Sequence, residues 1–242
     1  MKIVIPGGTG QVGAVLKRAL AGAGHEAVIL TRRPKHEGEV QWDGQNLGPW
    51  TAAVDGSDVV INLAGRTVSC RYTAANLQEM MDSRVDSARV VGAAIAGAAQ
   101  PPRVRWRRRS GARTPSRCSS AAMSWIHEHD FVRAVEFLID RGDIAGPVNL
   151  AAPHPLPQRA FMRTLRSVWG VPVGLPATKW MAEVGAFALR TDTELLLKSR
   201  RVVPGRLDQA GFDFQYTQWP QAADELVRRV RKRVGRGPAA RR

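Results

Sequence analysis

The first hundred residues alternate between short, continuous apolar runs and longer segments in which apolar residues recur every three or four positions. The continuous runs are too apolar for strands with an exposed face, so they predict buried parallel strands. The recurring pattern predicts helices between them. The expected strands are residues 2–6, 27–30, 39–42 and 58–63, and the expected helices are residues 12–23, 49–54 and 77–95. This alternation predicts an α/β fold with a doubly wound parallel sheet.

The loop between the first strand and the first helix carries three glycines at a spacing of three, Gly7, Gly10 and Gly13. In dinucleotide-binding folds the first permits a tight turn, the second lets the backbone approach a pyrophosphate, and the third lets helix and strand pack together. The phosphates then meet free N–H groups at the helix N-terminus. An ordinary turn would also use glycines, but the strand-loop-helix context favours a dinucleotide site.

The second expected strand is followed by Thr31 and then by the positions where an NAD-binding fold would place an acidic residue for the ribose 2′-hydroxyl. Here the chain has Arg32 and Arg33 instead. Guanidinium groups suit a 2′-phosphate by charge and by bidentate geometry. The alternative is that both are solvated loop charges. We expect both to bind the cofactor, and therefore NADP(H) in preference to NAD(H).

Five motifs in this order resemble the atypical short-chain dehydrogenase/reductases, and within them the NAD(P)-dependent epimerase/dehydratase-like branch with an appended C-terminal domain of unknown function (DUF1731 type). The motifs are Gly7–Gly13, Asn62–Gly65, Arg71–Thr73, Ser83–Val85 and Met123–Asp130. The resemblance covers residues 1 to about 102 and about 123 to 235. It implies a Rossmann-like sheet, incomplete in the middle, with a smaller, mainly helical C-terminal lobe.

The resemblance also implies which residues hold the cofactor. The phosphates would be lined by Gly7, Thr9, Gly10, Gln11, Val12 and Gly13. Arg32 would face the adenosine phosphate, and Leu63, Ala64 and Gly65 would run beneath the cofactor. An ordinary exit from a strand would account for Asn62–Gly65 equally well.

The pattern breaks at Arg103–Ser120, which has neither strand nor helix periodicity and few apolar residues. We therefore expect no central strand there. A fifth strand, its helix and a sixth strand are missing, about 30 residues or more. In the resembled family this block carries the catalytic tyrosine. The only tyrosines, Tyr72 and Tyr216, are followed four positions later by Asn76 and Pro220, so the chain has no Tyr-x-x-x-Lys pair to supply a general acid. We assign no catalytic residue.

Two accounts of Arg103–Ser120 stay open. The segment could be an arginine-rich arm that orders on an RNA or an acidic partner. Alternatively, it is non-native sequence, such as a frame-shifted stretch joining two intact family blocks. The abrupt stop and restart of the family pattern favours the second account.

The second block begins with an expected strand at Met123–His127, followed by a helix for which Asp130 is the expected N-cap. Capping and hydrogen bonding are more typical of Asp130 and His127 here than catalysis. His127 and His129 have no companion ligand, so no metal site is expected. The remaining expectations are a strand at residues 148–151 and helices at residues 158–169, 180–189, 191–198 and about 220–230.

The formal net charge of +15 comes from two stretches. Arg103–Arg117 has seven arginines, Arg228–Arg242 has seven arginines and Lys232, and neither has an acid. The remaining bases and acids balance. A nucleic-acid-binding domain normally spreads basic residues over a folded face, so we expect no nucleic-acid partner. The ordinary apolar content, 44%, excludes wholesale disorder.

The sequence also lacks the features of membrane-spanning and disulfide-rich proteins. No apolar run approaches the length that crosses a bilayer, so we expect no membrane partner. Cys70 and Cys118 have no paired spacing, which indicates neither a disulfide framework nor a zinc site. We therefore expect a cytoplasmic protein that acts on an unknown small-molecule substrate. The missing central elements would expose apolar sheet, so we also expect poor solubility or self-association.

The expected domains are a NAD(P)-binding Rossmann half (1–102), an irregular arginine-rich segment (103–122), the end of the epimerase-like domain (123–170), a helical C-terminal domain (171–236) and a basic tail (237–242). The leading hypothesis is an NADP-binding epimerase or oxidoreductase-like protein with an incomplete catalytic site. A non-catalytic NADP-binding regulatory protein is the alternative, and an arginine-rich nucleic-acid binder ranks third.

Overall fold

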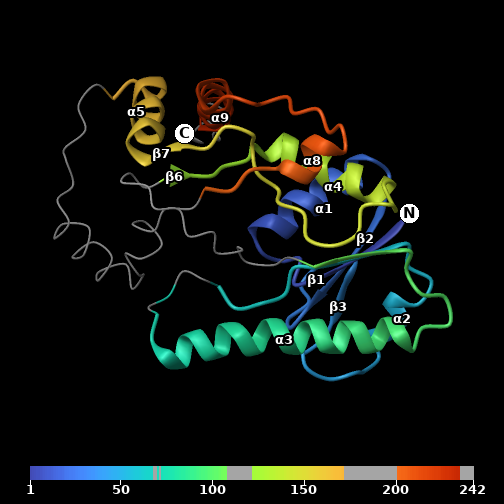
Figure 1. Ribbon diagram of the computed structural model, residues 1–242. Helices are drawn as coiled ribbons and strands as arrows, with labels where there is room; N and C mark the ends of the chain where they lie inside the picture. Colours follow the sequence, from blue (N-terminus) through green and yellow to red (C-terminus); the bar gives the residue numbers. More distant parts are fainter. Residues whose placement is uncertain (68–69, 71, 108–121, 172–200, 235–242) are drawn as a thin grey trace, which may run out of the picture. The chain divides into compact units, whose positions relative to one another are not determined.

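The computed structural model describes residues 1–67, 70, 72–107, 122–171 and 201–234 (Figure 1). The chain divides into two compact units. Of the described residues, the first unit contains 1–107 and 138–144, and the second contains 122–137, 145–171 and 201–234. Each unit is described by itself. None of the described helices is both long and apolar enough to span a bilayer.

The first unit is built on a five-stranded sheet whose neighbouring strands are all parallel. Its strands are β1 (Lys2–Pro6), β2 (Glu26–Thr31), β3 (Glu39–Gln41), β4 (Val59–Asn62) and β5 (Val104–Arg107). The order β3-β2-β1-β4-β5 confirms the predicted doubly wound, Rossmann-like fold. The strand order reverses direction between β1 and β4, and in such folds ligands bind where the carboxyl ends of these two strands meet.

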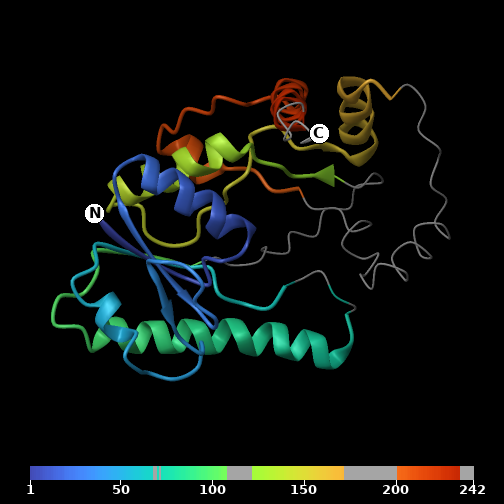
Figure 2. The same ribbon diagram turned by 180° about the vertical axis from the view of Figure 1, so that it is seen from behind.

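Helices cover both faces of this sheet (Figures 1 and 2). On one face Val4, Leu30 and Val60 form a core with Trp42, Trp50, the end of α2 (Thr51–Val54) and the C-terminal half of α3 (Ala74–Ala96). On the other face, Ile3, Ile5, Ile29 and Ile61 are almost fully buried. Helix α1 (Gln11–Gly22) lies on this side and buries Leu16 and Leu20. The continuous apolar strands are therefore explained by burial of both faces.

The fifth strand, which was expected to be missing, is present. The start of the arginine-rich segment forms β5, which pairs with β4 and aligns Val104 with Val59. The strand is the last in the sheet order and has one neighbour among the described strands, rather than a central position. An edge strand is held by backbone hydrogen bonds on one side and tolerates charged side chains, so its side-chain pattern gives little signal. Residues 108–121 of the segment lie outside the described residues.

The long helix expected at residues 77–95 is confirmed as α3. Its C-terminal half packs into the core through Val90, Val91, Ala94 and Ile95. The N-terminal half is less covered, since Leu77 is 44% exposed and Met81 is 61% exposed. Helical periodicity defines an apolar face without showing whether another element covers it.

The second unit is mainly helical among its described residues. Its elements are β6 (Ala122–Met123), α4 (Glu128–Asp140), β7 (Leu156–Pro157), α5 (Gln158–Trp169), α8 (Gly205–Gln209) and α9 (Trp219–Val234). Helix α4 belongs to this unit as far as Phe137, and its last residues belong to the first unit. β6 and β7 pair antiparallel. Trp219 is central to the core of this unit, since its ring stacks on Phe161 at 3.9 Å and meets Trp125 edge-on at 5.3 Å.

Several boundaries in this unit differ from the predictions. The strand expected at Met123–His127 is only the two-residue β6, and no strand forms at residues 148–151. Short apolar runs are ambiguous because periodicity cannot separate a strand from an extended loop. The helix at 158–169 and the closing helix are confirmed as α5 and α9. The helices expected at 180–189 and 191–198 lie outside the described residues.

Candidate cofactor site at the ends of β1 and β4

The glycine loop turns directly after β1, and Gly7 is its sharpest point. Gly7 has φ +73°, a conformation that favours glycine. Its N–H donates to the Leu30 carbonyl at the end of β2, at 2.9 Å. A Cβ at this position would lie 2.7 Å from the Cα of Ala64. The first glycine is therefore required both by the turn and by the close approach of the loop that follows β4.

The other two glycines differ in the space around them. A Cβ on Gly13 would lie 2.1 Å from the Gly8 carbonyl oxygen, so Gly13 lets the first turn of α1 pack against the loop. A Cβ on Gly10 would meet no atom nearer than the Gly7 oxygen at 4.0 Å. Gly10 is exposed, its φ of −77° suits any residue, and so neither packing nor conformation requires a glycine there.

The N-terminus of α1 begins at this open position. Gly10 is the N-cap and α1 has no side-chain cap. Gln11, Val12 and Gly13 form the first turn, preceded by the exposed Thr9. Uncapped N–H groups and the positive end of the helix dipole favour an anion. The structure thus brings the six predicted phosphate-lining residues together around a site suited to phosphate.

The segment after β4 lies beside the glycine loop. The Leu63 N–H donates to the Pro6 carbonyl at 2.9 Å, and the Ala64 N–H donates to the Asn62 side-chain oxygen at 3.0 Å. These bonds fix Leu63, Ala64 and Gly65 at the switch point, next to Gly7. The structure therefore brings both predicted backbone segments to one place.

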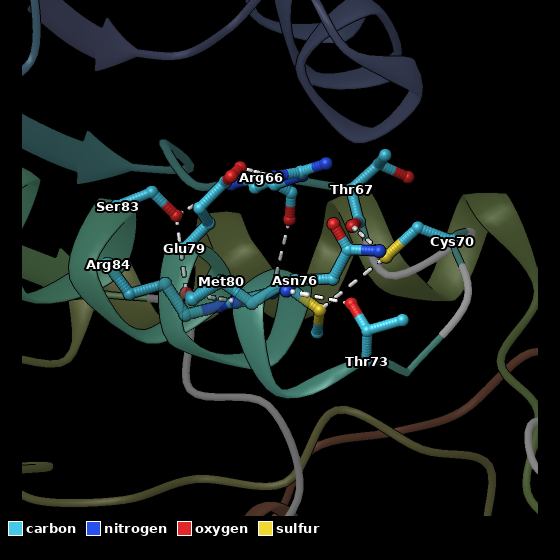
Figure 3. Close-up of polar contacts among 9 residues, drawn as sticks. All are labelled: Arg66, Thr67, Cys70, Thr73, Asn76, Glu79, Met80, Ser83 and Arg84. Carbon is cyan, nitrogen blue, oxygen red and sulfur yellow. Dashed lines mark hydrogen bonds and ion pairs between the residues drawn. The ribbon is translucent and has the colours of Figure 1, made fainter.

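Three side chains of helix α3 contact the next residue, Arg66 (Figure 3). The hydroxyl of Ser83 accepts the Arg66 N–H at 2.9 Å, and a guanidinium nitrogen of Arg84 donates to the Arg66 carbonyl at 3.4 Å. The carboxylate of Glu79 pairs with the Arg66 guanidinium. The Ser83–Val85 motif was recognised in the sequence, but the sequence did not indicate that its residues hold the backbone that follows β4.

Arg32 and Arg33 follow β2, on the far side of β1 from β4. Arg32 lines an open pocket together with the last residue of β3 and residues that follow it, namely Gln41, Trp42, Asp43, Asn46, Leu47, Gly48, Pro49 and Trp50. Arg33 is exposed and does not line this pocket. The pocket could not be predicted from the sequence, because most of its wall comes from a loop without regular secondary structure.

That loop is organised by Asp43. Its carboxylate accepts hydrogen bonds from the backbone N–H groups of Asn46 and Gln45 at 2.9 and 2.8 Å, and from the Asn46 side-chain amide at 2.7 Å. These bonds lower the pKa of Asp43 to about 2. Arg89 of α3 also donates to the Gln45 carbonyl at 3.0 Å. These hydrogen bonds hold the loop that lines the pocket in a single turn conformation.

His127 and Asp130 lie in the second unit and have structural roles. Asp130 is fully buried, and its carboxylate accepts the N–H groups of Gln215 and Tyr216 at 2.9 and 2.8 Å. The expected N-cap role of Asp130 is wrong, because Asp130 lies inside α4. At the start of the helix, His127 Nδ1 accepts the His129 N–H. His127 Nε2 is 2.8 Å from Glu225. The predicted hydrogen-bonding function is thus confirmed for both residues.

No group of three or more His, Cys, Asp or Glu side chains within the described ranges is arranged to hold a metal ion. Cys70 is a free cysteine whose sulfur lies 3.9 Å from the sulfur of Met80.

Comparison with known proteins adds to this geometry. The model of the NAD dependent epimerase/dehydratase family matches residues 3–106, and a domain of unknown function, DUF1731, matches residues 177–226. The two matches stand in the predicted order along the chain. Residues 3–106 are therefore similar to the NAD dependent epimerase/dehydratase family. The sheet order, the glycine loop and the C-terminal match all agree with this similarity.

Relatives within the epimerase family align along most of their length. An epimerase family protein of Staphylococcus haemolyticus is 26% identical over 299 positions, covering 93% of this chain and 99% of the relative. The epimerase family protein SDR39U1 of Bos taurus is 22% identical over 300 positions, covering 94% and 100%. Both alignments are longer than the 242-residue chain, so these relatives have positions without a counterpart here.

Solved structures show the same fold. Human SDR39U1, isoform 2, crystallised with NADPH, superposes with a TM-score of 0.76 at 21% identity, covering 94% of this chain and 99% of that one. The UDP-N-acetylglucosamine 4-epimerase of Bacillus cereus superposes with a TM-score of 0.69 at 14% identity, covering 96% and 99%. Family and fold together support an NAD(P)-dependent, epimerase-like function.

Proposed function

We propose that this chain binds NADP(H), in preference to NAD(H), at the edge of the sheet where β1 and β4 end. The observation that carries the proposal is Gly10, which is exposed at the uncapped N-terminus of α1 and has open space where a Cβ would be. Packing explains Gly7 and Gly13, whereas Gly10 is explained by the approach of a ligand. Phosphate oxygens fit this position because they accept hydrogen bonds from backbone N–H groups.

Each part of the site has one task in this proposal. The first turn of α1 binds the pyrophosphate, and Leu63–Gly65 runs beneath the cofactor. Arg32 binds the 2′-phosphate, and Arg33 adds positive charge beside it. The human relative that was crystallised with NADPH supports this choice of cofactor, while another structural neighbour was crystallised with NAD. When bound, the nicotinamide supplies hydride chemistry.

We further propose that the catalytic site of this chain is incomplete. Neither tyrosine is followed by a lysine four positions later. Tyr216 lies in the second unit, where its ring packs 3.9 Å from that of His127. Without a tyrosine-lysine pair, the ordinary proton transfer to or from a substrate hydroxyl has no donor. The substrate, if one is turned over, is a small molecule of unknown identity.

A non-catalytic, NADP-binding regulatory protein is the second candidate, favoured by the same absence of Tyr-x-x-x-Lys. The two candidates differ in whether hydride leaves bound NADPH. The test is to measure NADPH binding by calorimetry and then NADPH oxidation with a panel of aldehydes, ketones and nucleotide sugars. Binding without oxidation supports the regulatory candidate, and oxidation with any substrate contradicts an incomplete site. Absence of binding contradicts both.

We also propose that the protein self-associates. The exposed apolar residues Leu77, Met81 and Val85 recur every four positions on α3 and form one stripe. Contiguous exposed apolar surface of this kind promotes association. A monodisperse monomer in sedimentation velocity, with one cooperative melting transition, would contradict this proposal.

A further inference from the structure

The second unit carries a surface that the proposed cofactor site does not involve. Helices α5 and α9 pack side by side (Figures 1 and 2). Near their N-termini, Trp219 donates to the Phe161 carbonyl at 3.1 Å. Near their C-termini, Arg231 donates to the Trp169 carbonyl at 2.9 Å. The helices are therefore parallel, and their C-termini share one end of the unit, called here the α5/α9 end.

The α5/α9 end is strongly basic. Helix α5 contains three arginines and no acid, and the last seven residues of α9, Arg228–Val234, contain five basic residues and no acid. Arg228 is paired with Asp224. The basic side chains at this end are Arg166, Arg231, Lys232 and Arg233. The negative ends of two helix dipoles stabilise positive charges there.

The same end is also apolar. The buried stripe of α9 runs through Ala223 and Val227 and continues into Val230 and Val234, but the last two are exposed, Val234 by 76%. On α5, Trp169 is 44% exposed, its ring lies beneath the Arg231 guanidinium at 5.9 Å, and the adjacent Val171 is exposed as well. Apolar side chains thus continue the core outward and are surrounded by arginine and lysine.

We propose that the α5/α9 end docks on the surface of an anionic lipid bilayer. Basic residues around exposed tryptophan and aliphatic side chains are the composition of segments that lie in the headgroup region. The positive charges complement acidic headgroups, and each contributes about a fivefold gain in affinity near an anionic surface. Trp169 and the three valines would lie at the acyl boundary, which is where tryptophan is enriched.

Charge and chemistry favour a bilayer over other partners. A second copy would bring like charges together. A nucleic acid would use the arginines and could stack on Trp169, but it would leave the valines without a role. The expectation of no membrane partner followed from the absence of a spanning segment, and surface docking needs none. The proposal is independent of NADP(H) binding.

The experiment is co-sedimentation of the full chain with two kinds of vesicle, phosphatidylcholine alone and phosphatidylcholine mixed with phosphatidylserine. We expect binding to the mixed vesicles only, weakened by salt. K232Q/R233Q should weaken binding about 25-fold. W169S/V234S, which keeps every charge, should weaken it about tenfold. The control K17Q/R103Q removes two positive charges from the first unit and should leave binding unchanged.

Three results would overturn the proposal. The first is no binding to mixed vesicles, or equal binding to phosphatidylcholine alone. The second is equal weakening by K17Q/R103Q, which would indicate that net charge alone determines binding. The third is tighter binding to single-stranded RNA or to polyglutamate than to vesicles, reduced by K232Q/R233Q but not by W169S/V234S. Circular dichroism of each variant distinguishes lost docking from lost folding.

Discussion

Gly7 and Ala64 meet backbone to backbone: a Cβ on Gly7 would lie 2.7 Å from the Ala64 Cα. The contact joins the loop after β1 to the segment after β4, two parts of the chain that neighbouring parallel strands bring to the same edge. The switch point of the doubly wound sheet, where such folds bind their ligands, therefore has this contact and the N-terminus of α1 beside it.

Replacing either of the two glycines required by packing, Gly7 or Gly13, should destabilise the protein. Replacing Gly13 with Ala places a Cβ 2.1 Å from the Gly8 oxygen, and Gly7→Ala adds an unfavourable φ to the Ala64 contact. Each should lower the free energy of unfolding by about 1–3 kcal/mol. Gly92→Ala in α3, where a Cβ meets nothing within 4 Å, should instead raise it by about 0.5–1 kcal/mol. Urea denaturation measures all three, and equal effects would contradict this account of the loop.

Arg32 should select the cofactor. Charge-assisted hydrogen bonds to a 2′-phosphate contribute about 1.5–3 kcal/mol, so Arg32→Ala should weaken NADPH binding roughly 10- to 100-fold. NADH has no 2′-phosphate, so its affinity should stay the same. Arg33→Ala should weaken NADPH binding less than Arg32→Ala does, because Arg32 lines the pocket and Arg33 does not. Titration calorimetry with both cofactors gives the comparison, with Arg103→Ala as a control. Equal loss of NADH affinity would argue against a phosphate contact.

The sequence predicted most of the first unit because β1, β2 and β4 are buried on both faces and α1 carries a periodic apolar face. It missed β5, where backbone pairing at the sheet edge outweighs a poor side-chain pattern. Of the site, glycine spacing predicted the loop. The pocket beside Arg32 depends on how Asp43 folds an irregular loop, and the hold on Arg66 depends on residues 13 to 18 positions away. Neither has a local signature.

Asp130 should affect stability and leave cofactor binding unchanged. Its two oxygens each accept a backbone N–H in a fully buried position. Asp130→Asn keeps the shape but turns an amide N–H₂ toward one of these donors, at a cost of about 1–3 kcal/mol. Thermal denaturation and NADPH titration separate the two effects. A variant of normal stability that has lost NADPH affinity would show that the structural role is wrong.

Asp43 should give the turn before α2 a distinct pH dependence. Hydrogen bonds, first from Asn46, lower its pKa from 3.8 to about 2. A lowered pKa in the folded state means that the carboxylate stabilises the fold above pH 3.8 and that this contribution is lost as the pH falls toward 2. The difference in unfolding free energy between the wild type and Asp43→Ala should therefore be constant above pH 4 and shrink below it. A difference that does not change with pH would contradict the assigned hydrogen bonds.

The most direct test of the central claim is the NADPH affinity of Gly10→Ala. The new methyl group meets no protein atom within 4 Å and the backbone conformation suits alanine, so the unfolding free energy should not fall. The methyl group would, however, occupy the space through which the pyrophosphate approaches α1. We predict wild-type stability with NADPH affinity reduced at least tenfold, about 1.4 kcal/mol. Unchanged NADPH affinity in a stable Gly10→Ala variant would contradict the proposed cofactor site.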